Sequence, residues 1–212
     1  SGGVFANVKL NQTIYEKTKK NIFIMPGMDD GGLSIGAALH VYEEKSGLQA
    51  KENFDDIYFG PKYADDEILS QLKKFNFKFE KIENLEKKIA SYLHEGFIIG
   101  RFNGSMEWGP RALGNRSILA APVDKKINNK LNDRLNRTEF MPFAPIILKE
   151  KFSEYFNDYD TELKCIKFMT MTLDVKEEKI KSIPAVVHID NTARPQLVTK
   201  ETNKSLYNIL NE

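Results

Sequence analysis

The segment from Gly100 to Ser117, GRFNGSMEWGPRALGNRS, limits the possible folds more than any other part of the chain. It holds four glycines, one proline and three arginines. Glycine and proline interrupt helices and strands, so the segment is expected to be a loop. The apolar run FIIGRF at 97–102 comes first and predicts a strand. The predicted loop therefore follows the end of a strand, and its arginines lie on a backbone to which glycine gives unusual conformational freedom.

The glycines and arginines of this loop together predict an anion-binding site. Because glycine has no Cβ, the backbone N–H groups of Gly104, Gly109 and Gly114 can come close to a ligand. The planar guanidinium groups of Arg111 and Arg116 can donate paired hydrogen bonds to phosphate or carboxylate oxygens. The loop has neither the Gly-Lys-Ser/Thr ending of a Walker loop nor a dinucleotide fingerprint, so those two classes are set aside.

A second interpretation gives the same arginines a structural role. Arg111 and Arg116 would then pair with Glu107 or Glu139 and brace the loop. The local sequence leaves both roles open. We do not expect Ser117 to be a nucleophile, because no histidine is evidently placed to activate it.

Composition favours a globular protein without a strong overall electrostatic field. The chain of 212 residues carries 31 basic and 30 acidic side chains, a net charge of +1, so an anion site must be local. No apolar run is long enough for a membrane span, and the start does not resemble a signal peptide. The single cysteine, Cys165, cannot form an internal disulfide and is expected in the core. We expect a cytoplasmic protein with no membrane partner.

The remaining patterns predict an α/β (α+β) chain with a mixed, twisted sheet that follows a βαβα unit. Apolar runs predict strands at 4–6, 21–26, 140–148, 165–175 and 185–190. Amphipathic or capped segments predict helices at 14–20, from Gly31 onward, and at 64–75, 84–96 and 123–137. Polar, aromatic and turn residues at 49–62 predict a linker between a unit at 1–48 and a domain at 63–212.

Six blocks along nearly the whole chain resemble one known family, in the same order. They are SGGVFAN, PGMDDGGLSIGAA, YFGPKYADDEI, MEWGPRALGNRSILAAP, RTEFMPFAP and IPAVVHIDNTARPQLV. This combination resembles the O-carbamoyltransferases, which include nodulation-factor and antibiotic-tailoring enzymes. Two positions depart from the family pattern, because Met141 stands where an arginine is usual and Asn136 where a basic residue is common. One or two anion contacts of the family are therefore in doubt.

The resemblance implies two domains and a reaction in two steps. Residues 1–48 would end an actin/hexokinase-like carbamoyl-transfer domain, and residues 63–212 would form a truncated carboxyl-terminal domain similar to the YrdC-type fold. Carbamoyl phosphate and ATP would give carbamoyl adenylate, and the carbamoyl group would then pass to the hydroxyl of a small molecule. ATP and a divalent metal, iron or magnesium, are the implied cofactors.

Candidate site residues follow from the loop chemistry and from the resemblance. The expected catalytic residues are arginines that bind phosphate or carbamoyl oxygens: Arg111, Arg116 and Arg194. The expected substrate- and nucleotide-binding residues are Gly109, Gly114, Ser117, Arg137, His188 and Gln196. Asp30 is the expected metal ligand, although Asp29 competes with it and a helix cap is the simpler role. Arg194 can also be read as a surface arginine before a proline, while His40 and His94 are expected to be structural or exposed.

The resemblance also implies that both ends are cut. The family's His-x-x-x-His pair and its Asn-Thr-Ser-Phe-Asn segment are absent from this sequence. Residues 1–48 are then expected to expose apolar surface, to repack, or to form a homodimer. A rival interpretation is a non-catalytic module that binds a nucleotide or phosphometabolite, or RNA, although the balanced charge argues against nucleic acid.

Overall fold

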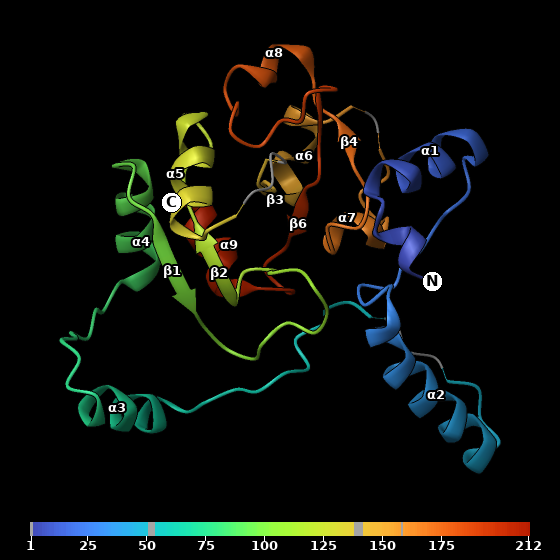
Figure 1. The fold of residues 1–212 in the computed structure, drawn as a ribbon, viewed down its shortest axis with the longest axis horizontal. Coiled ribbons are helices and arrows are strands. Elements are labelled where there is room, and N and C mark those ends of the chain that lie inside the picture. The colour runs from blue at the N-terminus through green and yellow to red at the C-terminus, as the bar shows by residue number, and fades with distance from the viewer. Residues whose placement is uncertain (1, 51–53, 138–141, 158) are drawn as a thin grey trace.

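A computed structural model describes residues 2–50, 54–137, 142–157 and 159–212 of this chain as a mixed α+β fold (Figure 1). The expected fold class is confirmed. The α-helices are α1 (Val8–Thr18), α2 (Leu33–Ser46), α3 (Asp65–Lys74), α4 (Leu85–His94), α5 (Lys126–Arg134), α6 (Phe152–Tyr155), α7 (Lys164–Lys167), α8 (Glu177–Ile180) and α9 (Lys204–Asn211). Short 3-10 helices span Gly3–Ala6, Asp30–Gly32 and Lys149–Lys151.

The described strands pair two by two. Strand β1 (Ile99–Phe102) runs antiparallel to β2 (Arg116–Leu119), and β3 (Ile146–Leu148) runs parallel to β6 (Gln196–Val198). The two-residue strands β4 (Leu173–Asp174) and β5 (Thr192–Ala193) form a third, antiparallel pair. Parallel and antiparallel pairing are both present, as expected, but the described strands are divided among three small sheets.

Several expected strands take other conformations. Residues 4–6 form part of a 3-10 helix, and neither 21–26 nor 185–190 is a strand. A strand needs a neighbour to pair with its backbone, and none of these segments pairs in that way. At 185–190, for example, the N–H of Val186 donates to the carbonyl of Ile183 at 3.1 Å. The segment 165–175, expected as one strand, begins within helix α7 and contains only the short strand β4. Of the strand expected at 140–148, residues 140 and 141 lie outside the described ranges, and Ile146–Leu148 form β3.

The helices expected from Gly31 onward and at 64–75, 84–96 and 123–137 are confirmed as α2, α3, α4 and α5, whereas the helix expected at 14–20 begins and ends earlier, as α1. Helix α3 begins with three acidic residues and ends with two lysines, which suits the helix dipole. Helix α4 is followed by Gly96 at φ 85°, a left-handed conformation that glycine adopts without strain. Helix α4 packs against α9 and against β1. This places α9 beside the strand pair that carries the arginine-rich loop.

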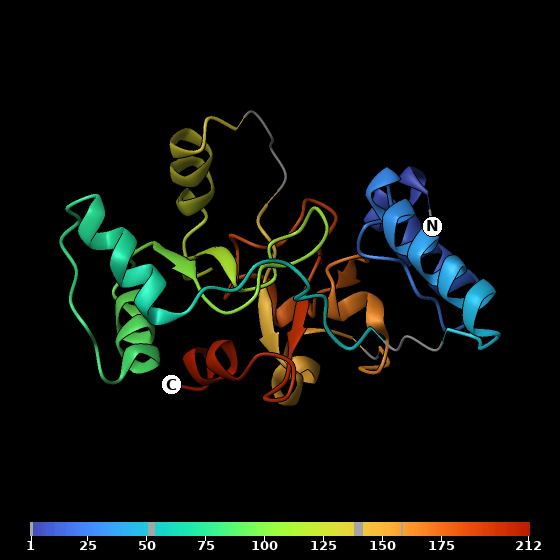
Figure 2. The same ribbon diagram turned by 90° about the horizontal axis from the view of Figure 1, so that it is seen from below.

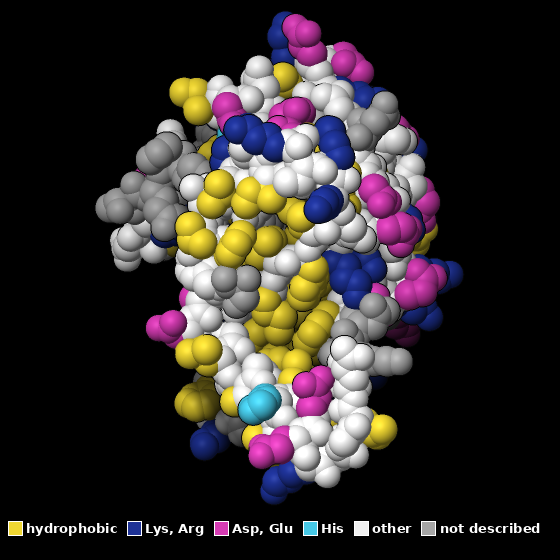
Figure 3. All heavy atoms as spheres, turned by 90° about the vertical axis from the view of Figure 1, so that its right-hand side faces the viewer, with side chains coloured by type: hydrophobic (Ala, Val, Ile, Leu, Met, Phe, Trp, Pro, Cys, Tyr) yellow, Lys and Arg dark blue, Asp and Glu magenta, His cyan; other side chains and the backbone are white. Residues whose placement is uncertain are grey.

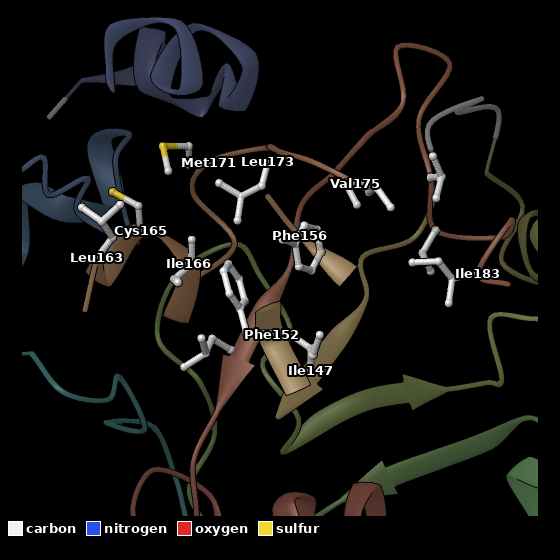
Figure 4. Packing of buried hydrophobic residues seen from close by; sticks show 14 of the residues in the cluster. Ile147, Phe152, Phe156, Leu163, Cys165, Ile166, Met171, Leu173, Val175 and Ile183 are labelled. Atoms are coloured by element: carbon white, nitrogen blue, oxygen red, sulfur yellow. The ribbon is translucent and has the colours of Figure 1, made fainter. Parts of the chain in front are cut away.

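The largest hydrophobic cluster lies in the carboxyl-terminal half and takes in residues near the amino terminus (Figure 4). Phe152, Leu163 and Leu173 are almost completely buried in it. Ile24 and Met28 belong to the same cluster. Residues between Phe5 and Met28 therefore share a core with the later part of the chain, while the division at 49–62 stays a prediction.

Polar side chains of α1 add to this attachment. The Nδ2 of Asn11 donates to the carbonyl oxygens of Phe5 at 2.8 Å and of Thr170 at 2.7 Å. Gln12 accepts from the hydroxyl of Thr172 at 2.8 Å. Because Asn11 and Gln12 are buried, these bonds hold α1 against the carboxyl-terminal half.

Helix α2 and its surroundings expose apolar side chains. Figure 2 shows α2 and α3 at opposite ends of the molecule, and no residue of α2 is buried. Figure 3 shows hydrophobic side chains gathered on the face where α1 and α2 lie. Phe23, Leu33 and Tyr42 are exposed, which agrees with the apolar surface expected of residues 1–48. Over the described ranges, the chain has no helix long and apolar enough to cross a bilayer.

Substitution of Ile24 tests whether the amino-terminal segment is part of the core. We expect Ile24→Ala to lower the free energy of unfolding by about 2–5 kcal/mol, because it leaves a cavity in the shared cluster. The control is Ile189→Ala, since Ile189 is fully exposed; it should change stability by less than about 0.5 kcal/mol. Urea unfolding measures both. Equal midpoints for the two variants would show that Ile24 contributes nothing to the core.

Candidate functional site

The loop between β1 and β2 is organised by one buried carboxylate. The Oε1 of Glu107 accepts hydrogen bonds from the backbone N–H groups of Leu113 at 2.7 Å, Asn115 at 2.7 Å and Arg116 at 3.1 Å. Glu107 is only 6% exposed. A buried carboxylate is costly unless it is hydrogen-bonded, and these bonds to a charged acceptor offset that cost. Glu107 therefore fixes the end of the loop just before β2.

Arg116 holds the loop from the other side. Its Nη1 donates to the carbonyl of Asn103 at 2.8 Å, and its Nη2 donates to those of Pro61 at 3.0 Å and Gly104 at 3.1 Å. The guanidinium carbon also lies 3.7 Å from the centroid of the Phe102 ring. Arg116 thus braces the loop through backbone carbonyls. Glu107 is engaged with amide groups, and Glu139 lies outside the described residues.

The loop also docks on earlier parts of the chain. The N–H of Trp108 donates to the carbonyl of Ile57 at 2.8 Å, and that of Gly60 donates to the carbonyl of Met106 at 2.9 Å. A Cβ on Gly27 would lie 2.5 Å from the Trp108 ring, so only glycine fits against it. The linker and the amino-terminal segment therefore help to fix the position of the loop.

Gly114 is held at both of its polar backbone groups. Its N–H donates to the hydroxyl oxygen of Ser117 at 2.8 Å, and its carbonyl accepts from the Nε of Arg101 at 2.6 Å. Its φ of 102° lies in a region where other residues are strained, and a Cβ would lie 2.4 Å from Leu206 in α9. The geometry therefore requires glycine here, and this amide is engaged within the chain.

A second set of polar groups supports the neighbouring residue, Leu113. Its carbonyl accepts from the hydroxyl of Tyr58 and from the Nε2 of Gln196, both at 2.8 Å. Burial raises the pKa of Tyr58 to about 12, so this hydroxyl keeps its proton. Gln196 is buried and its Oε1 has no hydrogen-bond partner among the described residues. In this structure Gln196 supports the loop from β6.

A pocket of about 930 Å³ lies beside β1 and β2. Apolar side chains from β1, β2, β3, α5 and α9 form most of its wall. Among the described residues that line it, none is acidic, and four are cationic: Arg101, Arg116, Arg137 and Lys151. A wall that carries cations without carboxylates favours a ligand with an apolar part and an anionic part.

The structure brings some of the predicted site residues to this pocket and leaves others elsewhere. Arg116, Ser117 and Arg137 line it, and the Arg137 guanidinium lies 4.9 Å from the centroid of the Phe143 ring. The other predicted residues do not line it: Gly109, Arg111, Gly114, His188, Arg194 and Gln196. Arg111 is half-buried, and burial lowers the pKa of its guanidinium. Ligand roles for all of these residues stay predictions.

His188 and Arg194 belong to a separate polar group. The Nδ1 of His188 lies 3.3 Å from the Thr192 hydroxyl, which donates to Asp190 at 2.7 Å. Lys9 forms an ion pair with Asp190 at 2.9 Å. The pKa of His188 is lowered, chiefly by burial, with positive charge on Arg194 and Lys9 adding to the effect. His188 is therefore mainly neutral at pH 7.

Asp30 is exposed at the start of the 3-10 helix Asp30–Gly32. The neighbouring Asp29 caps this helix by accepting from the N–H of Gly31 at 3.0 Å. No group of three or more metal-ligating side chains occurs within the described ranges. These residues alone do not compose a metal centre, and Asp30 as a metal ligand stays a prediction. Cys165 is fully buried, as expected of a core residue.

Sequence reasoning did not select Arg101 as a site residue. Arg101 lines the pocket, is only 8% exposed, and lies opposite Ser117 in the β1–β2 pair. Its place near the end of an apolar strand was visible in the sequence. Its pairing with Ser117 depends on strand register, which the sequence did not reveal.

Comparisons with known proteins agree on one family. Residues 90–212 match the family model described as "Carbamoyltransferase C-terminus", and residues 1–39 match the one described as "Carbamoyltransferase N-terminus". The two models lie in that order along the chain. They bracket the segment that holds the linker and α3.

Curated relatives align with the whole length of this chain. An uncharacterized protein of Methanocaldococcus jannaschii is 40% identical over 99% of this chain and 40% of its own length. Nodulation protein NolO of Bradyrhizobium diazoefficiens is 33% identical over 100% of this chain and 39% of its own length. Nodulation protein U of Azorhizobium caulinodans is 29% identical over 100% of this chain and 36% of its own length. The chain thus spans two fifths or less of each of these relatives.

Substitution of Glu107 tests the role of its carboxylate in the loop. We expect Glu107→Gln to lower the free energy of unfolding by about 2–3 kcal/mol, because the amide is a weaker acceptor and brings a donor beside the N–H of Arg116. The control is Glu44→Gln on the exposed face of α2, which should leave stability nearly unchanged. Chemical denaturation compares them. The same unfolding midpoint in both variants would mean that the carboxylate does not hold the loop.

Proposed function

The chain belongs to the carbamoyltransferase family, and we propose that the natural polypeptide carrying it makes carbamoyl adenylate from carbamoyl phosphate and ATP. It then transfers the carbamoyl group to a hydroxyl group of a small molecule. The carboxyl-terminal family match covers the β1–β2 loop and most of the described pocket wall. The first step is therefore proposed for this pocket.

The observation that carries the proposal is the charge of the pocket wall. Arg101, Arg116, Arg137 and Lys151 line it, and none of its described lining residues is acidic. Carbamoyl phosphate and ATP repel each other, so their reaction needs cations that hold both in place. Arginine suits this task because it stays protonated and donates in a fixed plane.

The apolar part of the wall suits the purine ring of ATP and the exclusion of water from the reacting groups. Side chains of β3, α5 and α9 offer a surface on which a purine ring can lie. By excluding bulk water they also strengthen the attraction between guanidinium groups and phosphates. In the overall balance, carbamoyl phosphate, ATP and one water give carbamoyl adenylate, phosphate and pyrophosphate. Residues of the pocket bind and orient the anions, and no residue is required as a nucleophile.

The acceptor hydroxyl and the divalent metal are proposed for the full-length enzyme. A metal would polarise the group that is transferred, and Asp30 would supply one carboxylate to it. The cytoplasm is the proposed compartment.

Pyrophosphate release tests the proposal. We expect the natural polypeptide to release pyrophosphate from ATP only when carbamoyl phosphate is present. Arg137→Gln should slow this release by about 10²-fold, because it removes a fixed positive charge from the pocket wall. Arg134→Gln is the matched control, since Arg134 is exposed on α5 and does not line the pocket; it should keep the original rate.

A coupled assay for pyrophosphate measures all three proteins. Release of pyrophosphate without carbamoyl phosphate would contradict the proposed first step. Binding of ATP without any release would instead favour a non-catalytic nucleotide-binding module.

A further inference from the structure

Arg101 is a buried cation that forms no ion pair with any residue in the described ranges. It is 8% exposed, and its Nη2 has no hydrogen-bond partner among the described residues. Burial lowers the pKa of its guanidinium, although the negative charges of Glu86 and Glu107 oppose this effect. A buried guanidinium without a paired carboxylate is costly for a folded protein.

The position of Arg101 is fixed by the loop. Its Nε donates to the carbonyl of Gly114, whose N–H donates to the Ser117 hydroxyl oxygen. Arg101 and Ser117 also face each other across the β1–β2 pair, and both line the pocket. One glycine therefore holds both side chains at the same place on the wall.

Both side chains keep donors for a ligand. The Ser117 oxygen accepts from Gly114, so its own hydroxyl proton is left to donate. Arg101 uses Nε within the chain and keeps donors at the end of its guanidinium. Arg116 differs, because its Nη1 and Nη2 both donate to backbone carbonyls. Of these two arginines, Arg101 has the terminal nitrogen, Nη2, that lacks a hydrogen-bond partner among the described residues.

We propose that Arg101 binds a phosphate group in this pocket, together with the hydroxyl of Ser117. The inference rests on the proposed function, since it takes the pocket to hold a phosphorylated ligand. An oxyanion here would accept from the guanidinium and from the serine hydroxyl, and it would neutralise the buried charge. The phosphate belongs to carbamoyl phosphate or to ATP, and separate titrations distinguish these two sources.

The test measures binding of ATP and of carbamoyl phosphate, one at a time, to the natural polypeptide by calorimetry. We expect Arg101→Gln to weaken at least one of the two ligands by about 10- to 100-fold, as the loss of a charged hydrogen bond predicts. The remaining affinity should depend less on salt concentration, because one ion pair is gone. Arg134→Gln should bind both ligands like the unaltered protein.

The Lys variant separates binding from folding. Arg101→Lys keeps the charge but loses the planar donor geometry, so we expect about 10-fold weaker binding in a protein that still folds, with a slightly lower melting temperature because the Gly114 carbonyl loses its bond to Nε. If Arg101→Gln does not fold, the affinities of Arg101→Lys decide whether Arg101 binds the phosphate group. Unaltered affinities and salt dependence in the folded Arg101 variants would overturn the inference and leave the proposed function standing. If the unaltered protein binds neither ligand, both the proposed function and this inference are wrong.

Discussion

The carboxylate of Glu107 is the interaction on which the rest of the site depends. It is buried, and it gathers three backbone N–H groups at the point where the loop turns into β2. A loop rich in glycine has much conformational entropy to lose, so a strong central acceptor is needed to order it. With the start of β2 fixed, Ser117 pairs with Arg101 and Arg116 pairs with Phe102. The positions of Arg101 and Arg116 on the pocket wall follow from that register.

The two arginines of the β1–β2 pair have different surroundings although they lie close together. Arg116 gives its donors to backbone carbonyls and stabilises the loop. Arg101 is more deeply buried and is held by a single carbonyl, that of Gly114. Because of this difference, Arg116 braces the loop while Arg101 is proposed to bind an anion. Of the two interpretations that the sequence left open for Arg116, the structure shows the bracing one, through backbone carbonyls, while anion binding by Arg111 and Arg116 stays a prediction.

Local patterns predicted α3, α4, α5 and the strand at 97–102 well, because caps, glycines and amphipathic spacing act within a few residues. The short helices α6–α8 and helix α9 were not predicted. The strand predicted from the apolar run at 21–26 was wrong, because a strand also requires a partner strand, which the run itself does not reveal. The site was predictable in part: Ser117 was expected at a ligand and lines the pocket. Arg101 was missed because its place on the pocket wall comes from strand register, and the need for glycine at 114 comes in part from Leu206, far along the chain.

The most direct test of the central claim is a crystal structure of the natural polypeptide with ATP and carbamoyl phosphate bound. Our account predicts phosphate oxygens in the pocket beside β1 and β2, within hydrogen-bond distance of Arg101 and Ser117, with the Glu107 bonds to the loop intact. Ligands bound at the polar group around His188 and Arg194, with this pocket left empty, would contradict it.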